Sequence, residues 1–438
     1  MAPTNCYMLM TGESLVVHYN FQRSFEKPPL QYWLTSFTLP RFQNPAVALR
    51  VWPILYGVLT SLALGWLVYL VRPNDPWLIP LAIAVLVSSP LFASESSRGL
   101  LDVGLTFFTL LTIVFAELAR KKSTWWFAAA IACWLGSLQK MPVTFLVWLI
   151  ILAVRFANRE ERAVLRSSAR PLVGSMILAI ALMSIWPLLQ LLKYEMPVWS
   201  VYHDEVIVWL GPNELGHRPY FENPIAMSLA GGLSGFLSLV APFLILFSTR
   251  ERSSRAVREI AWVALGFLVL TIVTNFRHVR YVIPIIPSLC FLVAIMFYSF
   301  LQRPAPIRKW AMAALVLFLA IGLVHAEIRI LVWRKDVAAE KLIAKKLGEL
   351  QQAGTQTVLI KAVVPGNDLL WDSFYLFHGN FRFPIIKLTT DEIRANPPKP
   401  PLNGACVARD FPVLQQLYPN VQVALSRAQF ICWQVPAQ

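Results

Sequence analysis

The sequence predicts an integral membrane protein: an all-α bundle of about ten transmembrane helices followed by a small C-terminal α/β domain. Three observations lead to this prediction. Apolar residues make up 57% of the 438 residues and charged residues only 14%, more apolar surface than a water-soluble core encloses. Long apolar stretches recur along most of the chain, and a tail of mixed composition follows them. The net charge of +15 is concentrated in some of the polar links and not in others.

Most of the apolar stretches are close to the ~20 residues that an α-helix needs to cross ~30 Å of hydrocarbon. Prolines inside several of them predict kinks, because packed neighbours can satisfy the freed carbonyl groups. The fourth and fifth stretches are the shortest. The ten stretches cover residues 47–71, 77–94, 100–119, 123–138, 141–156, 171–193, 225–248, 259–275, 281–301 and 309–331.

Lysine and arginine crowd into alternate links between these stretches, at residues 72, 120–122, 155–170, 250–258 and 303–309. By the positive-inside rule those links face the cytoplasm. The membrane domain then covers residues 47–333, with an extracytoplasmic first loop at 1–46 and an extracytoplasmic domain at 334–438. Because the basic residues follow this rule, they argue for membrane lipids as partners and against nucleic acid.

The outside location of the first loop raises a difficulty. No apolar segment of membrane length precedes it in the sequence, and it lacks the basic start, apolar run and cleavage site of a signal peptide. Either the loop is translocated unaided or the chain begins earlier, and we expect the second, with a leading membrane helix upstream of Met1.

The tail has the periodicity of a mixed α/β domain. It contains two cysteines, Cys406 and Cys432, which would pair in an oxidising compartment, although two free thiols are equally compatible with the sequence. Helices are predicted at 335–351 and 373–378, strands at 357–364, 382–387, 405–410 and 421–434, and a proline-rich loop at 396–401.

The first candidate site is the segment Phe25-Glu26-Lys27-Pro28-Pro29 in the first outer loop. Two prolines stiffen the backbone and remove two amide donors, so Glu26 and Lys27 are presented from a rigid turn. The alternative is an interfacial turn anchored by Tyr32 and Trp33, with both charges solvated.

Two further candidates border apolar stretches on the outer side. Arg98 and Asp102 open the third stretch at helical spacing, so they either pair with each other or line a polar cavity, because charge at membrane depth is costly. Lys140 lies where the chain turns between the fourth and fifth stretches. It either extends to the interface or contacts a lipid phosphate.

The remaining candidates lie in the longest outer link, residues 193–224, and before the ninth stretch. The long link holds His203 and Glu205, residue types that suit a divalent metal or a general base. Their spacing matches no specific metal signature, and the alternative is a solvated loop without a site. Arg277 and Arg280 either clamp an anionic lipid headgroup or mark the end of a helix.

Taken in order, these residues resemble a known family. The succession Phe-Glu-Lys-Pro-Pro-Leu-x-Tyr-Trp, Arg-x-x-x-Asp opening a span, Lys-x-Pro between two spans, a long outer loop and Arg-Tyr-x-x-x-x-x-Pro is similar to the protein O-mannosyltransferase and aminoarabinose-transferase group of the GT-C glycosyltransferases. The resemblance covers about residues 7–300, and its most specific element is the segment around Glu26. It implies an enzyme of the bacterial inner membrane that moves a sugar from a polyprenyl-phosphate carrier to a lipid or protein acceptor at the extracytoplasmic face, with inversion at the anomeric carbon.

The resemblance also suggests roles for the candidate residues. Cations must offset the charge that develops on the leaving phosphate, and the available ones are Lys27, Arg98, Lys140, Arg277 and Arg280. A carboxylate must accept a proton or hold a metal, and Glu26, Asp102 and Glu205 are the available acids. If a divalent metal takes part, Glu26 and His203 are the conceivable ligands.

One feature departs from the family pattern. An acidic pair normally stands just after the first membrane helix, and here it would fall before Met1, where the leading helix is also expected. This keeps a non-catalytic relative that only binds lipid-linked sugar as an alternative. A transporter is a third possibility, although it usually carries ionisable groups near mid-membrane, where these stretches hold almost none.

Overall fold

The computed structural model describes residues 13–20, 22–25, 27–42, 44–140, 142–195, 222–248, 254–273, 279–360, 362–364, 367–369, 375, 379 and 383–437. Contacts divide the chain into two units. We call Phe25–Arg329 the membrane unit and Met1–Ser24 with Ile330–Gln438 the outer unit, after the location that the sequence predicts for it. Each unit is described by itself.

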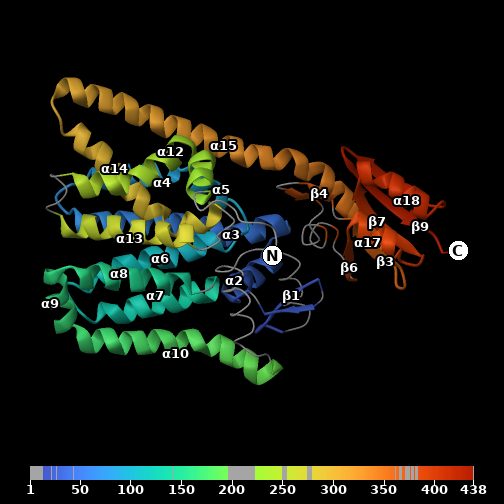
Figure 1. The fold of residues 1–438 in the computed structure, drawn as a ribbon, viewed down its shortest axis with the longest axis horizontal. Helices are drawn as coiled ribbons and strands as arrows, with labels where there is room; N and C mark the ends of the chain where they lie inside the picture. Colours follow the sequence, from blue (N-terminus) through green and yellow to red (C-terminus); the bar gives the residue numbers. More distant parts are fainter. Residues whose placement is uncertain are drawn as a thin grey trace. The chain divides into compact units, whose positions relative to one another are not determined.

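The membrane unit is a bundle of helices, and every predicted apolar stretch overlaps one or two of them (Figure 1). One helix, α15, starts in this unit and ends in the outer one. The elements are α2 (Leu30–Thr38), the 3₁₀ helix η1 (Leu39–Arg41), α3 (Pro45–Val71), α4 (Leu78–Val87), α5 (Pro90–Ser96), α6 (Asp102–Leu118), α7 (Trp125–Gln139), α8 (Val143–Ala157), α9 (Arg159–Ser167), α10 (Ala169–Tyr194), α12 (Glu222–Phe247), α13 (Arg255–Val273), the 3₁₀ helix η3 (Val279–Ile285), α14 (Ile286–Leu301) and α15 (Ala305–Glu349).

Four helices among the described residues are long and apolar enough to cross a membrane, and the bent pair α4 and α5 adds a fifth if it forms one span. The integral membrane character of the bundle follows from these helices. Helices α7 and α8 have 15 residues each, about 22 Å of helix and less than the hydrocarbon thickness. The expected number of ten spans therefore remains a prediction.

Burial distinguishes the central helix of the bundle from the helices at its rim. In the most apolar part of the α14 span 83% of the residues are buried, whereas the corresponding share in α10 and α15 is 22%. Figure 1 shows α10 and the first half of α15 at opposite edges of the bundle. Their exposed side chains are largely Leu, Ile and Val, so these two helices present the apolar surface that lipid covers.

Three irregular backbone segments contact one another in the membrane unit. The chain bends by 70° between α4 and α5, where Ser89 is extended ahead of Pro90 because a residue before proline avoids the helical region. Helix α12 is broken at Gly232, whose φ of 54° favours glycine. The third segment is η3, and α5, α12 and η3 all touch. Irregular backbone at membrane depth occurs where it is buried in protein or lines a polar cavity.

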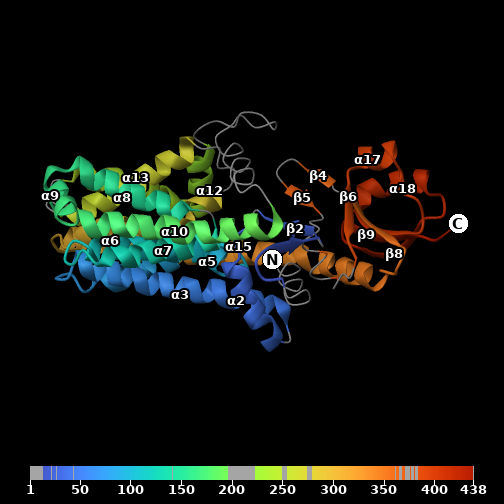
Figure 2. The same cartoon turned by 90° about the horizontal axis from the view of Figure 1, so that it is seen from below.

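The outer unit is built on a five-stranded sheet with the strand order β6-β3-β7-β9-β8. Figure 2 shows its strands β6, β9 and β8. Strand β3 pairs in parallel with both β6 and β7, and β9 pairs antiparallel with β7 and β8. Two-stranded sheets form from β1 with β2 and from β4 with β5. The elements are β1 (Val17–Tyr19), β2 (Gln22–Ser24), β3 (Gln356–Ile360), β4 (Ala362–Val364), β5 (Asn367–Leu369), β6 (Ile385–Leu388), α17 (Thr390–Ala395), β7 (Leu402–Val407), the 3₁₀ helix η4 (Ala408–Asp410), α18 (Phe411–Leu417), β8 (Gln422–Arg427) and β9 (Phe430–Val435).

Each face of the five-stranded sheet carries its own apolar core. Leu347 of α15 packs with Leu359 and Cys432 on one face. Leu414 of α18 packs with Val358 and Cys406 on the other. The two cysteines are free thiols on opposite faces, because the strand register pairs Ala405, and not Cys406, with Cys432. A disulfide between them, which the sequence left open, is therefore not formed.

Two expectations for the outer unit differ from the structure. The single strand predicted at 421–434 is a hairpin of β8 and β9, and Ala428 between them adopts a positive φ of 51°. The strand predicted at 405–410 ends at Val407, and its last three residues form the 3₁₀ helix η4. Within the predicted first loop, 1–46, the side-chain amide of Asn20 exchanges two hydrogen bonds, of 2.8 and 2.9 Å, with the backbone of Ile385.

Candidate functional site

Lys140 and Asp102 form an ion pair between α7 and α6. Lys140 follows the last residue of α7 in extended conformation, with φ −168° and ψ 102°, so its side chain leaves the helix direction. Its ammonium group donates a hydrogen bond to Oδ1 of Asp102. Asp102 is the first residue of α6 and is only 3% exposed, where the positive end of the helix dipole also favours a carboxylate. Two of the predicted site residues are thus in direct contact.

The segment next to this ion pair is fixed by a buried amide pair. The Gln139 side chain donates a hydrogen bond of 2.8 Å to the Gln31 side chain of α2, and both residues are fully buried. Gly104 provides the space for Gln139, because a Cβ added at Gly104 would lie 2.3 Å from Gln139 Nε2. Helix α2 begins three residues after Lys27. The Gln31–Gln139 contact therefore ties the helix that follows the Lys27 segment to the residue preceding Lys140.

Arg98 has a different partner from the one that helical spacing suggested. Its guanidinium donates a hydrogen bond of 2.7 Å to Oε1 of Glu95, whereas Asp102 is bound by Lys140. The predicted alternative of an Arg98–Asp102 pair is therefore wrong. The reason lies in the backbone: α5 ends at Ser96 and α6 begins at Asp102, so residues 98 and 102 do not lie on one continuous helix.

Arg280 and Tyr281 of η3 lie beside the ion pair of Lys140 and Asp102. The ring centre of Tyr281 lies 4.4 Å from the Lys140 ammonium and 5.8 Å from the Arg280 guanidinium carbon, both within the range of cation–π interaction. The Arg280 Nε is buried and has no hydrogen-bond partner among the described residues. The charges of Asp102 and Arg280 also interact with the Glu95 carboxylate. Predicted residues from three elements are thus gathered around Glu95.

Sequence reasoning missed three ionisable residues of this region: Glu95, His325 and Arg329. A Cβ added at Gly232, in the break of α12, would lie 2.8 Å from Nδ1 of His325, and the charge of Arg329 interacts with those of Glu95 and Arg98. A signal was present in the sequence, since His325, Glu327 and Arg329 stand close together near the end of the apolar stretch 309–331. The expectation that the apolar stretches hold almost no ionisable groups overlooked the last part of the stretch 309–331, which holds these residues.

Four other predicted site residues lie outside the described residues, namely Glu26, His203, Glu205 and Arg277. Lys27 is described and partly buried. Within the described part of the chain no group of three or more His, Cys, Asp or Glu side chains is placed to hold a metal ion. The residues proposed as metal ligands, Glu26 and His203, are not among those searched.

A second charged network lies among the arginine-rich links. Arg155 of α8 is 2% exposed, and its guanidinium donates hydrogen bonds of 2.8 to 3.0 Å to Glu259 of α13. Arg120 binds Glu259 and Glu161 of α9. These contacts join α8, α9 and α13 to the end of α6, and each carboxylate is matched by arginine. The network is therefore a structural tie between helices.

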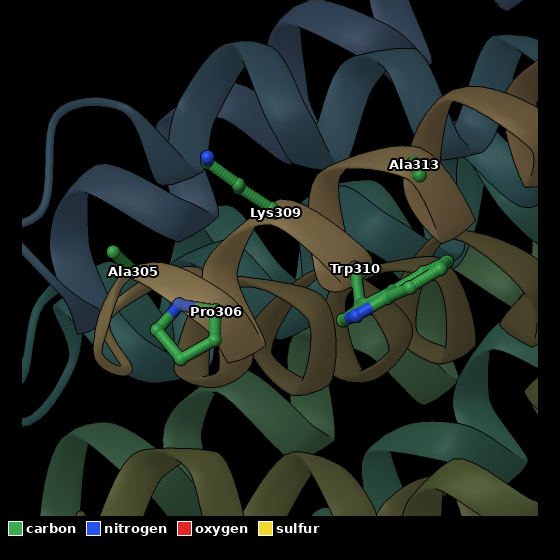
Figure 3. Close-up of a pocket in the computed structure, with 5 residues that line it drawn as sticks. All are labelled: Ala305, Pro306, Lys309, Trp310 and Ala313. Carbon is green, nitrogen blue, oxygen red and sulfur yellow. The ribbon is translucent and has the colours of Figure 1, made fainter.

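Two surface hollows lie away from the candidate site residues. One, of about 560 Å³, adjoins the arginine network and is lined by Arg155, Glu259 and Trp262 among others. The other, of about 530 Å³, is shown in Figure 3, where its lining residues all come from the first turns of α15. Lys309 and the 79% exposed Trp310 belong to it. Neither hollow is lined by Asp102, Lys140 or Arg280.

Comparison with known proteins places these features in a family context. Residues 6–200 match the sequence model of the family described as dolichyl-phosphate-mannose-protein mannosyltransferase. An uncharacterised protein of Aquifex aeolicus is 22% identical over 66% of this chain and 56% of its own length. The undecaprenyl phosphate-alpha-4-amino-4-deoxy-L-arabinose arabinosyl transferase of Pseudomonas aeruginosa is 26% identical over 68% of this chain and 53% of its own length. The chain thus spans about half the length of these curated relatives.

Solved structures show the same fold. ArnT from Cupriavidus metallidurans bound to undecaprenyl phosphate superposes with a TM-score of 0.72 at 15% identity, covering 99% of this chain and 92% of that one. The archaeal oligosaccharyltransferase AglB from Archaeoglobus fulgidus, in complex with an inhibitory peptide and a dolichol-phosphate, gives a TM-score of 0.56 at 13% identity over 89% of this chain and 62% of that one. The resemblance inferred from the sequence motifs is therefore confirmed.

Proposed function

We propose that this chain, a relative of the lipid-linked glycosyltransferases, transfers a sugar from a polyprenyl-phosphate carrier to a lipid or protein acceptor at the extracytoplasmic face of a bacterial inner membrane. The observation that carries the proposal is the gathering of Arg98, Lys140 and Arg280 around the buried carboxylates of Glu95 and Asp102. Ionisable side chains at membrane depth are costly and mark substrate sites when they converge. The family match and the names of the relatives supply the substrate class.

The proposed reaction places its main electrostatic demand on the leaving group. When the bond between the sugar and the carrier phosphate breaks, negative charge grows on the phosphate, and fixed cations near it stabilise the transition state. Arginine suits this role because its guanidinium contacts two phosphate oxygens at once. Lys27 and Arg280 are the first choices for these contacts, and Arg98, Lys140 and Arg277 complete the proposed set.

The acceptor needs a group that takes its proton. Glu26, Asp102 and Glu205 are the proposed acids, and of these only Asp102 lies within the described residues, in its ion pair with Lys140. A divalent metal ion remains part of the proposal, with Glu26 and His203 as ligands. No step of the reaction is assigned to the metal, because its proposed ligands are outside the described residues.

The proposal is tested by sugar transfer in reconstituted membranes. Radiolabelled undecaprenyl-phosphate aminoarabinose and polyprenyl-phosphate mannose are each offered as donor, with membrane lipid and membrane protein as acceptors. Lys27→Ala and Arg280→Ala should each lower the efficiency of donor use by roughly ten- to a hundredfold, the effect of losing one charge-assisted contact. Glu26→Gln should mainly lower turnover, because a base or metal ligand is needed chiefly while the bond forms.

The matched control is Arg308→Ala, which removes an exposed arginine from the first turn of α15. It should transfer sugar at the wild-type rate. Wild-type rates in all three site variants would mean that the active site has been placed wrongly. Binding of donor without transfer to any acceptor would favour the alternative of a lipid-linked-sugar-binding relative.

A further inference from the structure

The hollow beside the arginine network lies where two apolar stretches meet polar links. Its volume of about 560 Å³ is within the range of about 300–1,000 Å³ that small-molecule sites occupy. Its lining comes from Arg120 just after α6, from the end of α8, from α9 and from the first turns of α13. The predicted stretch 141–156 ends at this place and the stretch 259–275 begins there. We therefore place the hollow at the level of the lipid headgroups.

Carboxylates outnumber guanidinium groups in the buried network at this hollow. Arg120 and Arg155 together bind three carboxylates, those of Glu117, Glu161 and Glu259. Oε1 of Glu161 accepts a hydrogen bond of 2.6 Å from Arg120, whereas Oε2 is buried without a hydrogen-bond partner among the described residues. A buried acceptor that lacks a donor is unfavourable. Because Glu161 lines the hollow, this side favours a ligand that carries N–H donors and a positive charge.

Arg258 gives the α13 side of the hollow a positive charge. It is half-buried, and its side chain makes no hydrogen bond or ion pair within the described part of the chain. Arg255, one turn earlier, also lines the hollow, but it is bound at 2.5 Å by Glu160. Arg258 and Glu161 thus line one hollow without pairing with each other. A ligand that carries both a negative and a positive group can lie between them and match both.

Apolar surface borders the charged part of the hollow. Trp262 follows Arg258 by one turn on the same face of α13, and it is 53% exposed. Ala153 and Val154 of α8 also line the hollow. Tryptophan is enriched where headgroups meet hydrocarbon. The ligand that fits this combination has a headgroup with both charges and an apolar part, as a zwitterionic phospholipid does.

We propose that this hollow binds the headgroup of phosphatidylethanolamine from the surrounding membrane, with the phosphate on Arg258 and the ammonium group on Glu161. The ammonium group supplies the N–H donor that Glu161 Oε2 lacks. A choline headgroup has the same charges but no N–H group, and an anionic lipid leaves the carboxylates without a further cation. The inference goes beyond the proposed function, because the hollow is not lined by the residues proposed for sugar transfer.

The first experiment measures lipid binding to the purified protein in detergent micelles by native mass spectrometry. The probes are phosphatidylethanolamine, its N-methyl and N,N-dimethyl derivatives and phosphatidylcholine, which share acyl chains and net charge but differ in N–H donors. The affinity should fall by about tenfold or more at the last methylation, where the last donor is lost. Phosphatidylglycerol, which has no ammonium group, should bind as weakly as phosphatidylcholine. Equal affinity for all five lipids, or a preference for phosphatidylglycerol, would overturn the proposal.

The second experiment locates the bound lipid. Arg258→Gln should weaken binding of phosphatidylethanolamine by about tenfold or more, and Arg258→Lys, which keeps the charge, should recover a large part of the affinity. The matched control is Arg166→Gln, which changes an exposed arginine of α9 outside the hollow. It should bind the lipid as the wild type does. Wild-type affinity in Arg258→Gln would overturn the proposal.

A second pair of variants does not depend on the folding of Arg258→Gln. Ala157 is exposed and lines the hollow, so Ala157→Leu should fill part of it and weaken lipid binding. Ala163, an exposed residue of α9, does not line the hollow, and Ala163→Leu should leave binding unchanged. Equal affinities of these two variants would place the lipid elsewhere on the protein and overturn the proposal.

The same headgroup chemistry also occurs in a water-soluble molecule, glycerophosphoethanolamine. At a concentration equal to that of the lipid it should not displace phosphatidylethanolamine, because it lacks the acyl chains that contact the apolar border of the hollow. Displacement at equal concentration would assign the hollow to a soluble ligand and overturn the choice of a lipid. Sugar transfer is not measured in any of these experiments, so their failure leaves the proposed function as it stands.

Discussion

The ammonium group of Lys140 is bonded to the carboxylate of Asp102, which lies 38 positions earlier in the chain. The same ammonium lies over the ring of Tyr281. One side chain thus connects the end of α7 to the start of α6 and to η3. The side chain of Asp102 is 4% exposed and that of Lys140 is 12% exposed, so both charges depend on each other for compensation.

The first prediction concerns the stability of this ion pair. Asp102→Asn or Lys140→Met should each lower the free energy of unfolding by about 3–5 kcal/mol, because either change leaves an uncompensated buried charge. The double variant should be less destabilised than the sum of the two single variants. Denaturation in detergent micelles measures all three. The exposed pair Lys346–Glu349 is the control, and its loss should cost at most about 1 kcal/mol. Additive effects at Asp102 and Lys140 would show that the pair is not coupled.

A second prediction concerns the close approach of α6 and α7. Gly104→Ala should destabilise the bundle by about 1–3 kcal/mol, because the new methyl group would lie within 2.3 to 2.9 Å of the Gln139 and Tyr56 side chains. It should also weaken donor binding by displacing Gln139, the neighbour of Lys140. Gly174→Ala in α10 is the matched control, because its new methyl group meets only Phe127, at an ordinary 3.4 Å. Equal melting temperatures of the two variants would contradict the prediction.

The third prediction concerns the thiols of the outer unit. Burial raises the pKa of Cys432 to about 12 and raises that of Cys406 as well, so neither is a thiolate at pH 8. Peptide mass spectrometry should find both unmodified after maleimide treatment of the native protein and both modified after denaturation.

A thiol pKa higher in the folded chain than its unfolded value of about 8.5 stabilises the fold fully below that pH. The stability that the two protonated thiols contribute should decline as the pH rises from about 8.5 toward 12. Rapid maleimide labelling of the native protein at pH 8 would contradict the raised pKa values of the two thiols.

The fourth prediction concerns orientation in the membrane. A membrane-impermeant thiol reagent applied from the outside should label Ala353→Cys, an exposed residue of the outer unit, and should not label Ser167→Cys at the end of α9. Both variants are made in a Cys6→Ser background. Labelling of Ser167→Cys but not of Ala353→Cys would reverse the topology and with it the face assigned to the site.

The individual residues of the site were easier to predict than their partners. Asp102 and Lys140 attract attention in the sequence because they are charges beside apolar stretches, but their mutual contact depends on the packing of α6 on α7. Helical spacing suggested Asp102 as the partner of Arg98, and it failed because α5 ends at Ser96 before α6 begins.

The overlooked residues have a common cause. Glu95 follows directly after the apolar stretch 77–94, on a short helix created by the bend before Pro90, and the sequence gives no sign that it is buried. Arg329 lies near the end of the apolar stretch 309–331, on a helix that continues into the outer unit. Their significance depends on the bend between α4 and α5 and on the close approach of Gly322 to Ser88, and such tertiary contacts are absent from a single sequence.

The order of synthesis places a temporal constraint on the ion pair of Lys140 and Asp102. Glu95 and its partner Arg98 are made first, Asp102 follows them, and Lys140 is added only after α7. A chain emerging from the ribosome therefore carries Asp102 without its partner until α7 is complete. Unpaired charges resist burial in lipid, so α6 is expected to remain loosely inserted until Lys140 arrives. A chain interrupted between α6 and Lys140 would then be a target for membrane quality control.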